Sequence, residues 1–259
     1  MPPIVLFESE GHRNILLEDP ELGSAVPSNV HLIVHGAQGI LLDPGGPKAF
    51  RFIYPAVLAE LRRAKLTHLF FSHQDPDIIA GANAWLTQTT AHAYVSRLWT
   101  RFVPHFGLDR VMAESLVPIP DEGGVLALGD LDLLVLPAHF IHSPGNFQVY
   151  DPASKILYSG DLGASLGPPG AFVEDFDAHL RFMDGFHRRY MAGRRAMQVW
   201  ARLVRQLDIE TIAPQHGSIF RGKVLVQRFI DWAEGLDCGI DLLEETALPT
   251  VRLPEGKPA

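Results

Sequence analysis

The sequence contains a single cysteine, Cys238, among its 259 residues. One thiol cannot form a disulfide within the chain, and it cannot supply a cysteine-rich metal site. We interpret Cys238 as a small buried residue, because unpaired cysteines usually occupy apolar interiors. A metal site in this chain would therefore be built from histidine and carboxylate side chains.

Long hydrophobic runs are also missing. No stretch approaches the roughly 18 apolar residues that are needed to span a bilayer. The first residues, Met1 to Ile4, lack the charged region and the long apolar region of a signal peptide. We therefore expect a cytoplasmic protein with no membrane partner.

Positive charge is in deficit, since 22 lysines and arginines face 30 aspartates and glutamates, for a formal net charge of -8. A nucleic-acid partner would require a basic patch that neutralises phosphates. The nearest candidates are the pair Arg62 and Arg63 and the arginines between positions 188 and 195. Both groups have helical spacing and are interpreted as solvated helix faces. We therefore expect no nucleic-acid partner.

What the sequence does contain is an alternation of short β-prone runs and helical segments, typical of an α/β protein. Its 47% hydrophobic content allows a core of ordinary size, and its length predicts one domain over residues 1–259. Apolar periodicity and turn signals give the expected elements. The predicted helices are 50–63, 78–86, 178–207 and 224–235, and the predicted strands are 14–17, 30–34, 39–42, 67–71, 93–95, 131–136, 147–150, 156–158 and 210–213.

A polar loop directly after the predicted strand 67–71 is the first candidate for chemistry. His73, Asp75 and Asp77 occupy alternate positions in it. Alternate side chains of extended backbone point to the same side, and Pro76 favours an extended conformation at Asp75. The three side chains can therefore converge on a metal ion. The alternative is a capped loop, in which Asp75 or Asp77 caps the next helix.

Three later segments each place one ligand-type residue after a strand-like run and beside glycine or proline. These residues are His142, Asp161 and His216. Loops that leave the same edge of the sheets in an α/β protein meet at one site. Four segments of this kind together predict a shared metal site.

The other histidines are less informative. His139 lies three residues before His142 and is either an alternative ligand or a group that orients the site. His35, His187 and the nearby Tyr190 could line the pocket, but we interpret them as packing or surface residues. The same packing or surface role is expected for His12, His31, His68, His92, His105 and His179.

The order of these motifs resembles the metallo-β-lactamase superfamily, in which His-x-His-x-Asp-His is followed by a His, a bridging Asp and a terminal His. The resemblance runs from the turn at 43–46 to His216, and it implies an αββα sandwich of two mixed β-sheets flanked by helices. Here Asp75 stands at the middle His of the leading motif, and Ile78 stands at its last His. A carboxylate at the middle position is similar to the diiron branch, which comprises flavodiiron proteins and related oxygen-binding diiron proteins. These carry Glu there, one methylene longer than Asp75.

Two further segments, 139–146 and 186–191, are similar to the oxygen-binding group. The resemblance implies six metal ligands, with His73, Asp75 and His142 at one ion, Asp77 and His216 at the other, and Asp161 bridging them. Two imidazoles with one carboxylate form a set associated with non-haem Fe(II) and O2 chemistry. Three carboxylates against two divalent ions leave a net charge near +1, which favours the ferric level. We therefore predict two iron ions, with zinc or manganese as competitors.

The resemblance also frames the predicted function. Flavodiiron proteins carry a flavodoxin domain after this one, whereas the 259 residues contain no Gly-rich phosphate loop followed by a strand–helix unit. We therefore expect no built-in electron donor and predict a diiron protein that binds or senses O2. Two alternatives stay open, an O2 or NO reductase served by an external electron donor and a dinuclear hydrolase of thioesters, lactones or phosphoesters. A homodimer also stays open, because related folds often form dimers.

Overall fold

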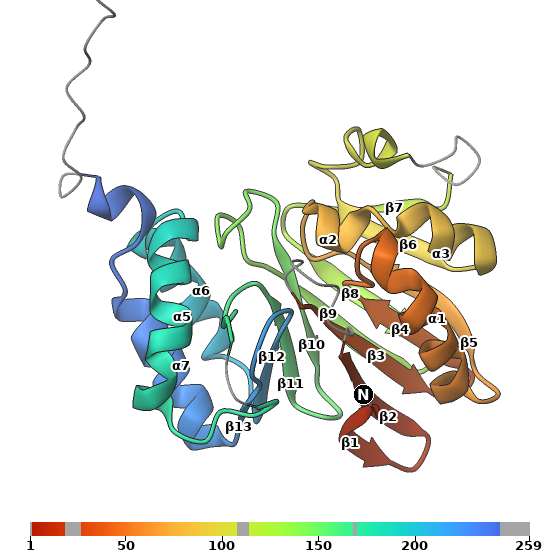
Figure 1. Ribbon diagram of the computed structural model, residues 1–259, viewed down its shortest axis with the longest axis horizontal. Coiled ribbons are helices and arrows are strands. Elements are labelled where there is room, and N and C mark those ends of the chain that lie inside the picture. The colour runs from red at the N-terminus through yellow and green to blue at the C-terminus, as the bar shows by residue number, and fades with distance from the viewer. Residues whose placement is uncertain (1, 19–26, 108–113, 168–169, 244–259) are drawn as a thin grey trace, which may run out of the picture.

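Two β-sheets packed face to face form the centre of the molecule, and helices cover the outer face of each (Figure 1). The structure, a computed structural model, describes residues 2–18, 27–107, 114–167 and 170–243. Among these residues the first sheet has seven strands, which lie side by side in sequence order. They are β1 (Ile4–Ser9), β2 (His12–Glu18), β3 (Asn29–His35), β4 (Gln38–Leu42), β5 (Lys65–Phe70), β6 (His92–Ser96) and β7 (Leu116–Ile119).

Both sheets are mixed. In the first, β1 to β4 are antiparallel and β4 to β7 are parallel. In the same part of the chain, the second sheet has six strands in the order β13-β12-β11-β10-β9-β8, where β11 and β12 are the parallel pair. Its strands are β8 (Gly124–Leu128), β9 (Leu131–Pro137), β10 (Phe147–Asp151), β11 (Ile156–Gly160), β12 (Thr211–Pro214) and β13 (Phe220–Arg221).

The helices divide between the two outer faces (Figure 1). The first sheet is covered by α1 (Pro47–Leu61), α2 (Pro76–Ile79) and α3 (Ala82–Gln88). The second sheet is covered by α5 (Phe176–Tyr190), α6 (Arg194–Val204) and α7 (Lys223–Gly235). Two short 3-10 turns, η1 (Val103–Phe106) and η2 (Gly239–Leu242), complete the described elements. No helix in the described ranges combines the length and the apolar character needed to cross a membrane.

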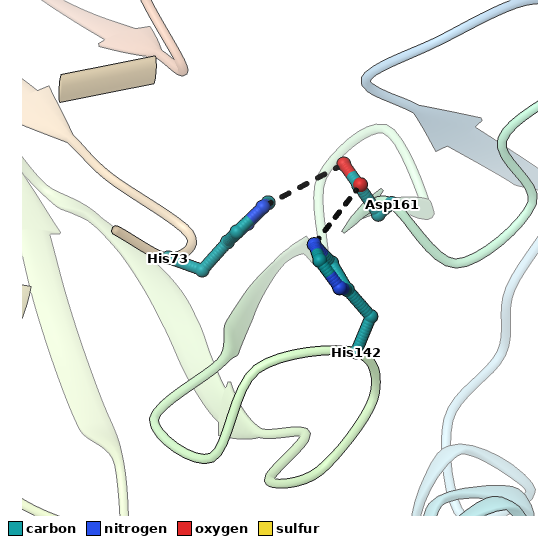
Figure 2. A group of neighbouring side chains, drawn as sticks. All are labelled: His73, His142 and Asp161. Atoms are coloured by element: carbon teal, nitrogen blue, oxygen red, sulfur yellow. Dashed lines mark ion pairs between the residues drawn. The ribbon is translucent and has the colours of Figure 1, made fainter. Parts of the chain in front are cut away.

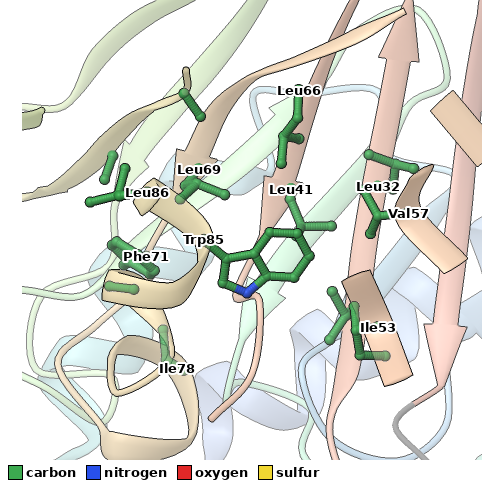
Figure 3. Packing of buried hydrophobic residues seen from close by; sticks show 14 of the residues in the cluster. Leu32, Leu41, Ile53, Val57, Leu66, Leu69, Phe71, Ile78, Trp85 and Leu86 are labelled. Atoms are coloured by element: carbon green, nitrogen blue, oxygen red, sulfur yellow. The ribbon is translucent and has the colours of Figure 1, made fainter. Parts of the chain in front are cut away.

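Buried apolar side chains form three layers among these residues, one between the sheets and one under each set of helices. Strand β3 explains how the layers arise. Leu32 packs in the layer under α1, whereas its neighbour Ile33 packs between the sheets. Successive side chains of a strand point to opposite faces, so a strand that is covered on both faces reads as a continuous apolar run. The layer under α1 and α3 is centred on Trp85 (Figure 3). The predicted αββα sandwich is therefore confirmed.

Two of the predicted helices are each broken in two. The stretch 178–207 forms α5 and α6, separated by extended backbone at Met191 to Gly193. Gly193 lies against η2, where an added Cβ would be 3.1 Å from Ile240 Cγ1. The stretch 78–86 is split by Gly81, where a Cβ would be 2.6 Å from the Gly45 carbonyl oxygen. Tertiary contacts at these glycines override the helical periodicity.

Candidate metal centre

The candidate ligands follow strands that end at one edge of the sandwich. In the second sheet β9, β11 and β12 run in the same direction, so their carboxyl ends lie together. His142 lies in the loop after β9, Asp161 follows β11 and His216 follows β12. From the first sheet, the loop after β5 brings His73 to the same edge. The Phe147 backbone N–H donates to the Ser72 carbonyl at 2.9 Å and joins these two loops.

His73, His142 and Asp161 form the centre of the site. One ligand atom from each lies within 4.8 Å of the other two. The Nε2 atom of His142 is 3.4 Å from Asp161 Oδ2, and that of His73 is 3.9 Å from Asp161 Oδ1 (Figure 2). The two imidazoles thus face the same carboxylate from different loops.

Asp75 adds a second carboxylate to this group. Its Oδ2 lies 3.3 Å from His142 Nε2 and 3.7 Å from His73 Nε2. Asp75 occupies the N-cap position of α2, yet its side chain makes no capping hydrogen bond. The capping alternative is therefore wrong for Asp75, whose carboxylate faces the two histidines.

Asp77 and His216 form a second group beside Asp161. The Nε2 atom of His216 is 3.2 Å from Asp77 Oδ2 and 3.7 Å from Asp161 Oδ1. The Asp161 carboxylate is therefore close to the histidines of both groups. The structure brings all six residues that the sequence singled out into one cluster.

The donor set fits divalent metal ions. His73 Nε2 and Asp161 Oδ1 are buried, and neither has a hydrogen-bond partner in the described part of the chain. Such orphaned polar atoms are rare in folded proteins and require an explanation. Metal–ligand bonds of about 2.1 Å place neighbouring ligand atoms roughly 3.0–3.5 Å apart. The ligand atoms that face each other here are separated by 3.2 to 3.9 Å.

The electrostatics of the cluster also favour a cation. The hydrogen bond from His142, together with the nearby His73 imidazole, holds the pKa of Asp75 well below its usual range. Burial lowers the pKa of His73, but Asp161 and Asp75 outweigh burial and raise that pKa to about 9. Burial also lowers the pKa of His216, but Asp77 and Asp161 outweigh burial and raise that pKa to about 9. Without metal, the carboxylates favour protonated imidazoles. A divalent ion can replace these protons and supply the positive charge that the carboxylates attract.

Hydrogen bonds behind the candidate ligands fix the orientation of their rings. His216 Nδ1–H donates to the Pro27 carbonyl at 2.8 Å, which leaves Nε2 free for a metal. His73 Nδ1 bonds the Ser72 hydroxyl at 2.9 Å. The Ser72 backbone N–H in turn donates to Asp43 at 2.8 Å, and burial raises the pKa of that carboxyl to about 6.

Aromatic side chains of α5 cover one ligand. The Tyr190 ring meets the His142 ring edge-on at 5.7 Å between centroids. Phe186 stacks on Tyr190 at 4.6 Å. The Tyr190 side chain is 55% exposed, which agrees with its interpretation as a surface residue, and its ring covers part of His142.

His187 packs beneath the Asp161 loop and is not part of the cluster. Its Nε2 accepts a hydrogen bond from the Gly163 N–H at 2.9 Å, and its Nδ1–H donates to the Met183 carbonyl at 2.7 Å. These partners require the neutral ring with its proton on Nδ1. Complete burial lowers the pKa of His187 to about 4. The interpretation of His187 as a packing residue agrees with this environment.

We expect acidification to destabilise the metal-free protein partly through His187. The folded-state pKa of about 4 lies below the ordinary 6.5, so the unfolded chain takes up the proton first. The contribution of neutral His187 to the free energy of unfolding is present above pH 6.5 and is lost as the pH falls towards 4. This contribution is on the order of 3 kcal/mol in all. His187→Gln retains an acceptor for Gly163 but does not titrate. Urea unfolding between pH 7.5 and 4.5 will therefore give a shallower pH slope for this variant, and equal slopes would contradict the assignment.

Two other histidines lie away from the site. His139 Nε2–H donates to the Asp121 carbonyl at 2.7 Å, and the ring lines a separate apolar cavity of about 610 Å³ beside α6. His35 lies at the opposite edge of the sheets, where its Nδ1 is 3.3 Å from His12 Nδ1. His12 itself forms a buried 2.8 Å ion pair with Asp151. No local sequence pattern marks this pair, whose members are 139 residues apart.

Known proteins resemble this chain in both sequence and structure. A family model described as "ODP family beta lactamase" matches residues 26–217. A solved structure of the peroxy diiron species of chemotaxis sensor ODP has a TM-score of 0.84 and 40% identity, covering 95% of this chain and 99% of that one. The apo state of chemotaxis sensor ODP from T. denticola has a TM-score of 0.82 and 40% identity, covering 94% of this chain and 98% of that one. A flavoprotein from Thermotoga maritima gives 0.70 at 18% identity, covers 89% of this chain and 60% of that one, and shares the fold alone.

Two curated relatives match over shorter parts of their length. The type A flavoprotein of Rhodobacter capsulatus is 27% identical over 196 residues, which are 73% of this chain and 44% of the relative. An uncharacterized protein of Methanocaldococcus jannaschii is 28% identical over 123 residues, which are 44% of this chain and 30% of the relative. This chain therefore spans less than half the length of both.

Proposed function

The chain belongs to the ODP beta-lactamase family, and on this basis we propose that it is a non-haem diiron protein that binds or senses O2. The observation that carries the proposal is the meeting of three carboxylates and three imidazoles around Asp161. The solved ODP structures, at 40% identity over nearly the whole chain, support the same assignment, since one of them is a peroxy diiron species.

The proposed ligand set is His73, Asp75, Asp77, His142, Asp161 and His216. Two iron ions, when bound, supply the redox chemistry of O2 uptake. The contribution of the chain is to hold the ions close together and to balance their charge with Asp75, Asp77 and Asp161. Three carboxylates against two divalent ions favour the ferric level and weaken Lewis acidity. A hydrolytic dizinc site would favour more imidazole, as in sites with three His ligands.

The identity of residue 78 supports an open coordination position on the ion that would lie beside Asp77. Ile78 stands where the superfamily motif has a histidine, and it is fully buried among the apolar side chains around Phe71 and Trp85 (Figure 3). It therefore offers no donor to the ion near His216. A small molecule such as O2 can take the place that a protein ligand leaves open, while the rings of Tyr190 and Phe186 restrict access beside His142.

The test is to reduce the iron-loaded protein without oxygen and then admit air. We expect a new visible absorption band that is absent before air and absent from the zinc-loaded protein. An unchanged spectrum would contradict O2 binding. Rapid and continuous O2 consumption with an added flavoprotein or rubredoxin donor would identify a reductase instead. Service by such a donor and assembly as a homodimer stay predictions.

A further inference from the structure

The turn that carries His216 is held by a residue of the other sheet. Asn29, the first residue of β3, donates from Nδ2 to the Pro214 carbonyl at 3.0 Å and to the Gly217 carbonyl at 2.8 Å. Its backbone N–H donates to the Gln215 carbonyl at 2.5 Å. Asn29 therefore contacts the chain on both sides of His216.

The chemistry of these contacts requires an amide. Both side-chain partners are backbone carbonyl oxygens, which only accept hydrogen bonds, so the NH2 group of Asn29 must face them. Each of its two hydrogens has one acceptor. Aspartate has the same shape but no hydrogen to donate, and its charge would repel both carbonyls. Asn29 is buried, with 7% of its surface exposed, so water is a poor substitute for the lost donor.

The turn itself is sharply constrained. Gly217 has a φ of +78°, and an added Cβ would lie 2.1 Å from Ser165 Oγ. The His216 ring is fixed at its far nitrogen by the Pro27 carbonyl. Asn29 holds the backbone of the turn and the Pro27 carbonyl holds the imidazole ring. The Nε2 atom of His216 therefore points towards Asp77 and Asp161.

We propose that Asn29 is a positioning residue for His216 and thereby controls occupancy of the metal position beside Asp77. The inference rests on the proposed dinuclear site. It predicts a selective effect, because Asn29 bonds only the turn behind His216 among the ligand-bearing loops. An ion near His73, Asp75 and His142 would be held by residues of other loops.

The chain offers a reciprocal variant for comparison. Asn146 Nδ2 donates to the Ile141 carbonyl in the loop that carries His142. Asn29→Asp should lower the affinity for the ion beside His216, whereas Asn146→Asp should lower the affinity for the ion beside His142. The two substitutions are chemically identical and differ only in the loop that they disturb.

The experiment is a Co2+ titration of the metal-free full chain, followed by calorimetry and visible absorption. We expect the parent to bind two ions, and Asn29→Asp to bind one with parental affinity and the other at least about 10-fold more weakly. In a His216→Ala background, Asn29→Asp should cause no further loss of Co2+ affinity. A purely structural role would lower affinity in both backgrounds. Asn29→Ser keeps one donor, and serves as the second variant if Asn29→Asp does not fold, with a smaller expected loss.

Two parental affinities in Asn29→Asp, or equal weakening of both ions, would overturn the positioning role. A parent that binds fewer than two Co2+ ions would instead overturn the dinuclear site itself. The two failures are therefore distinguishable, and neither depends on the response to O2.

Discussion

Asp161→Asn is expected to abolish binding of both metal ions. The Asp161 carboxylate lies 3.4 to 3.9 Å from the Nε2 atoms of His73, His142 and His216. An amide of the same size removes the negative charge and one oxygen donor from the centre of the cluster. Loss of an outer hydrogen-bonding partner typically costs about 10–100-fold in metal affinity, so we expect substitution of this proposed shared ligand to lower metal affinity by more than about 100-fold. Iron analysis after dialysis and Co2+ titration measure the effect.

The matched control is Asp132→Asn. Asp132 is an exposed carboxylate on β9, in the same sheet but away from the cluster. It undergoes the same change of charge and should leave two ions per chain. Retention of two tightly bound ions by Asp161→Asn would show that Asp161 does not bridge the site.

Asp151→Ala is expected to cause the largest loss of stability. Asp151 is fully buried and bonds His12 at 2.8 Å and Asn14 at 2.7 Å, so it ties β2 of one sheet to β10 of the other. Removing one partner of a buried ion pair leaves the other uncompensated, which typically costs about 3–5 kcal/mol. Urea unfolding measures this change in the free energy of unfolding.

The pH dependence of the same pair has a defined sign. Burial raises the pKa of Asp151, but hydrogen bonds from His12 and Asn14 outweigh burial and lower it. Its contribution is therefore present above the ordinary carboxyl pKa of 3.8 and is lost as the pH falls below that value. Asp151→Ala should lack this acid-dependent loss.

A nearby pair provides the control. Asp130 bonds His35 at the same 2.8 Å, but its side chain is 96% exposed. Exposed ion pairs contribute little to stability because solvent screens them. Asp130→Ala should leave the unfolding curve nearly unchanged. Equal losses from Asp151→Ala and Asp130→Ala would contradict the role assigned to burial.

The interior of the fold was predictable from sequence, whereas its edges were not. The nine predicted strands coincide with the interior strands of the two sheets, and the four strands that were not predicted, β1, β7, β8 and β13, are the sheet edges. Interior strands are covered on both faces and read as apolar runs. Strand β1 has no buried position, and in β8 exposed positions interrupt the buried ones, so no such run appears.

The candidate ligands were predictable for a related reason. Each candidate ligand lies in the segment that follows an interior strand. The direction of these strands brings the segments to one edge of the sandwich. The residues that orient the ligands were not predictable. Asn29 and the carbonyls that it bonds are 185 and 188 residues apart, and nothing local in the sequence marks such a contact. The same holds for His187 and Gly163, which are 24 residues apart on different elements.

The proposed function requires two iron ions at the cluster around Asp161. The most direct test is to purify the protein without added metal from iron-supplemented cells and to count iron and zinc per chain by elemental analysis. We expect about two irons per chain and their loss in Asp161→Asn. About two zincs per chain, persisting despite the iron supplement, would contradict the proposed function and favour a hydrolytic site.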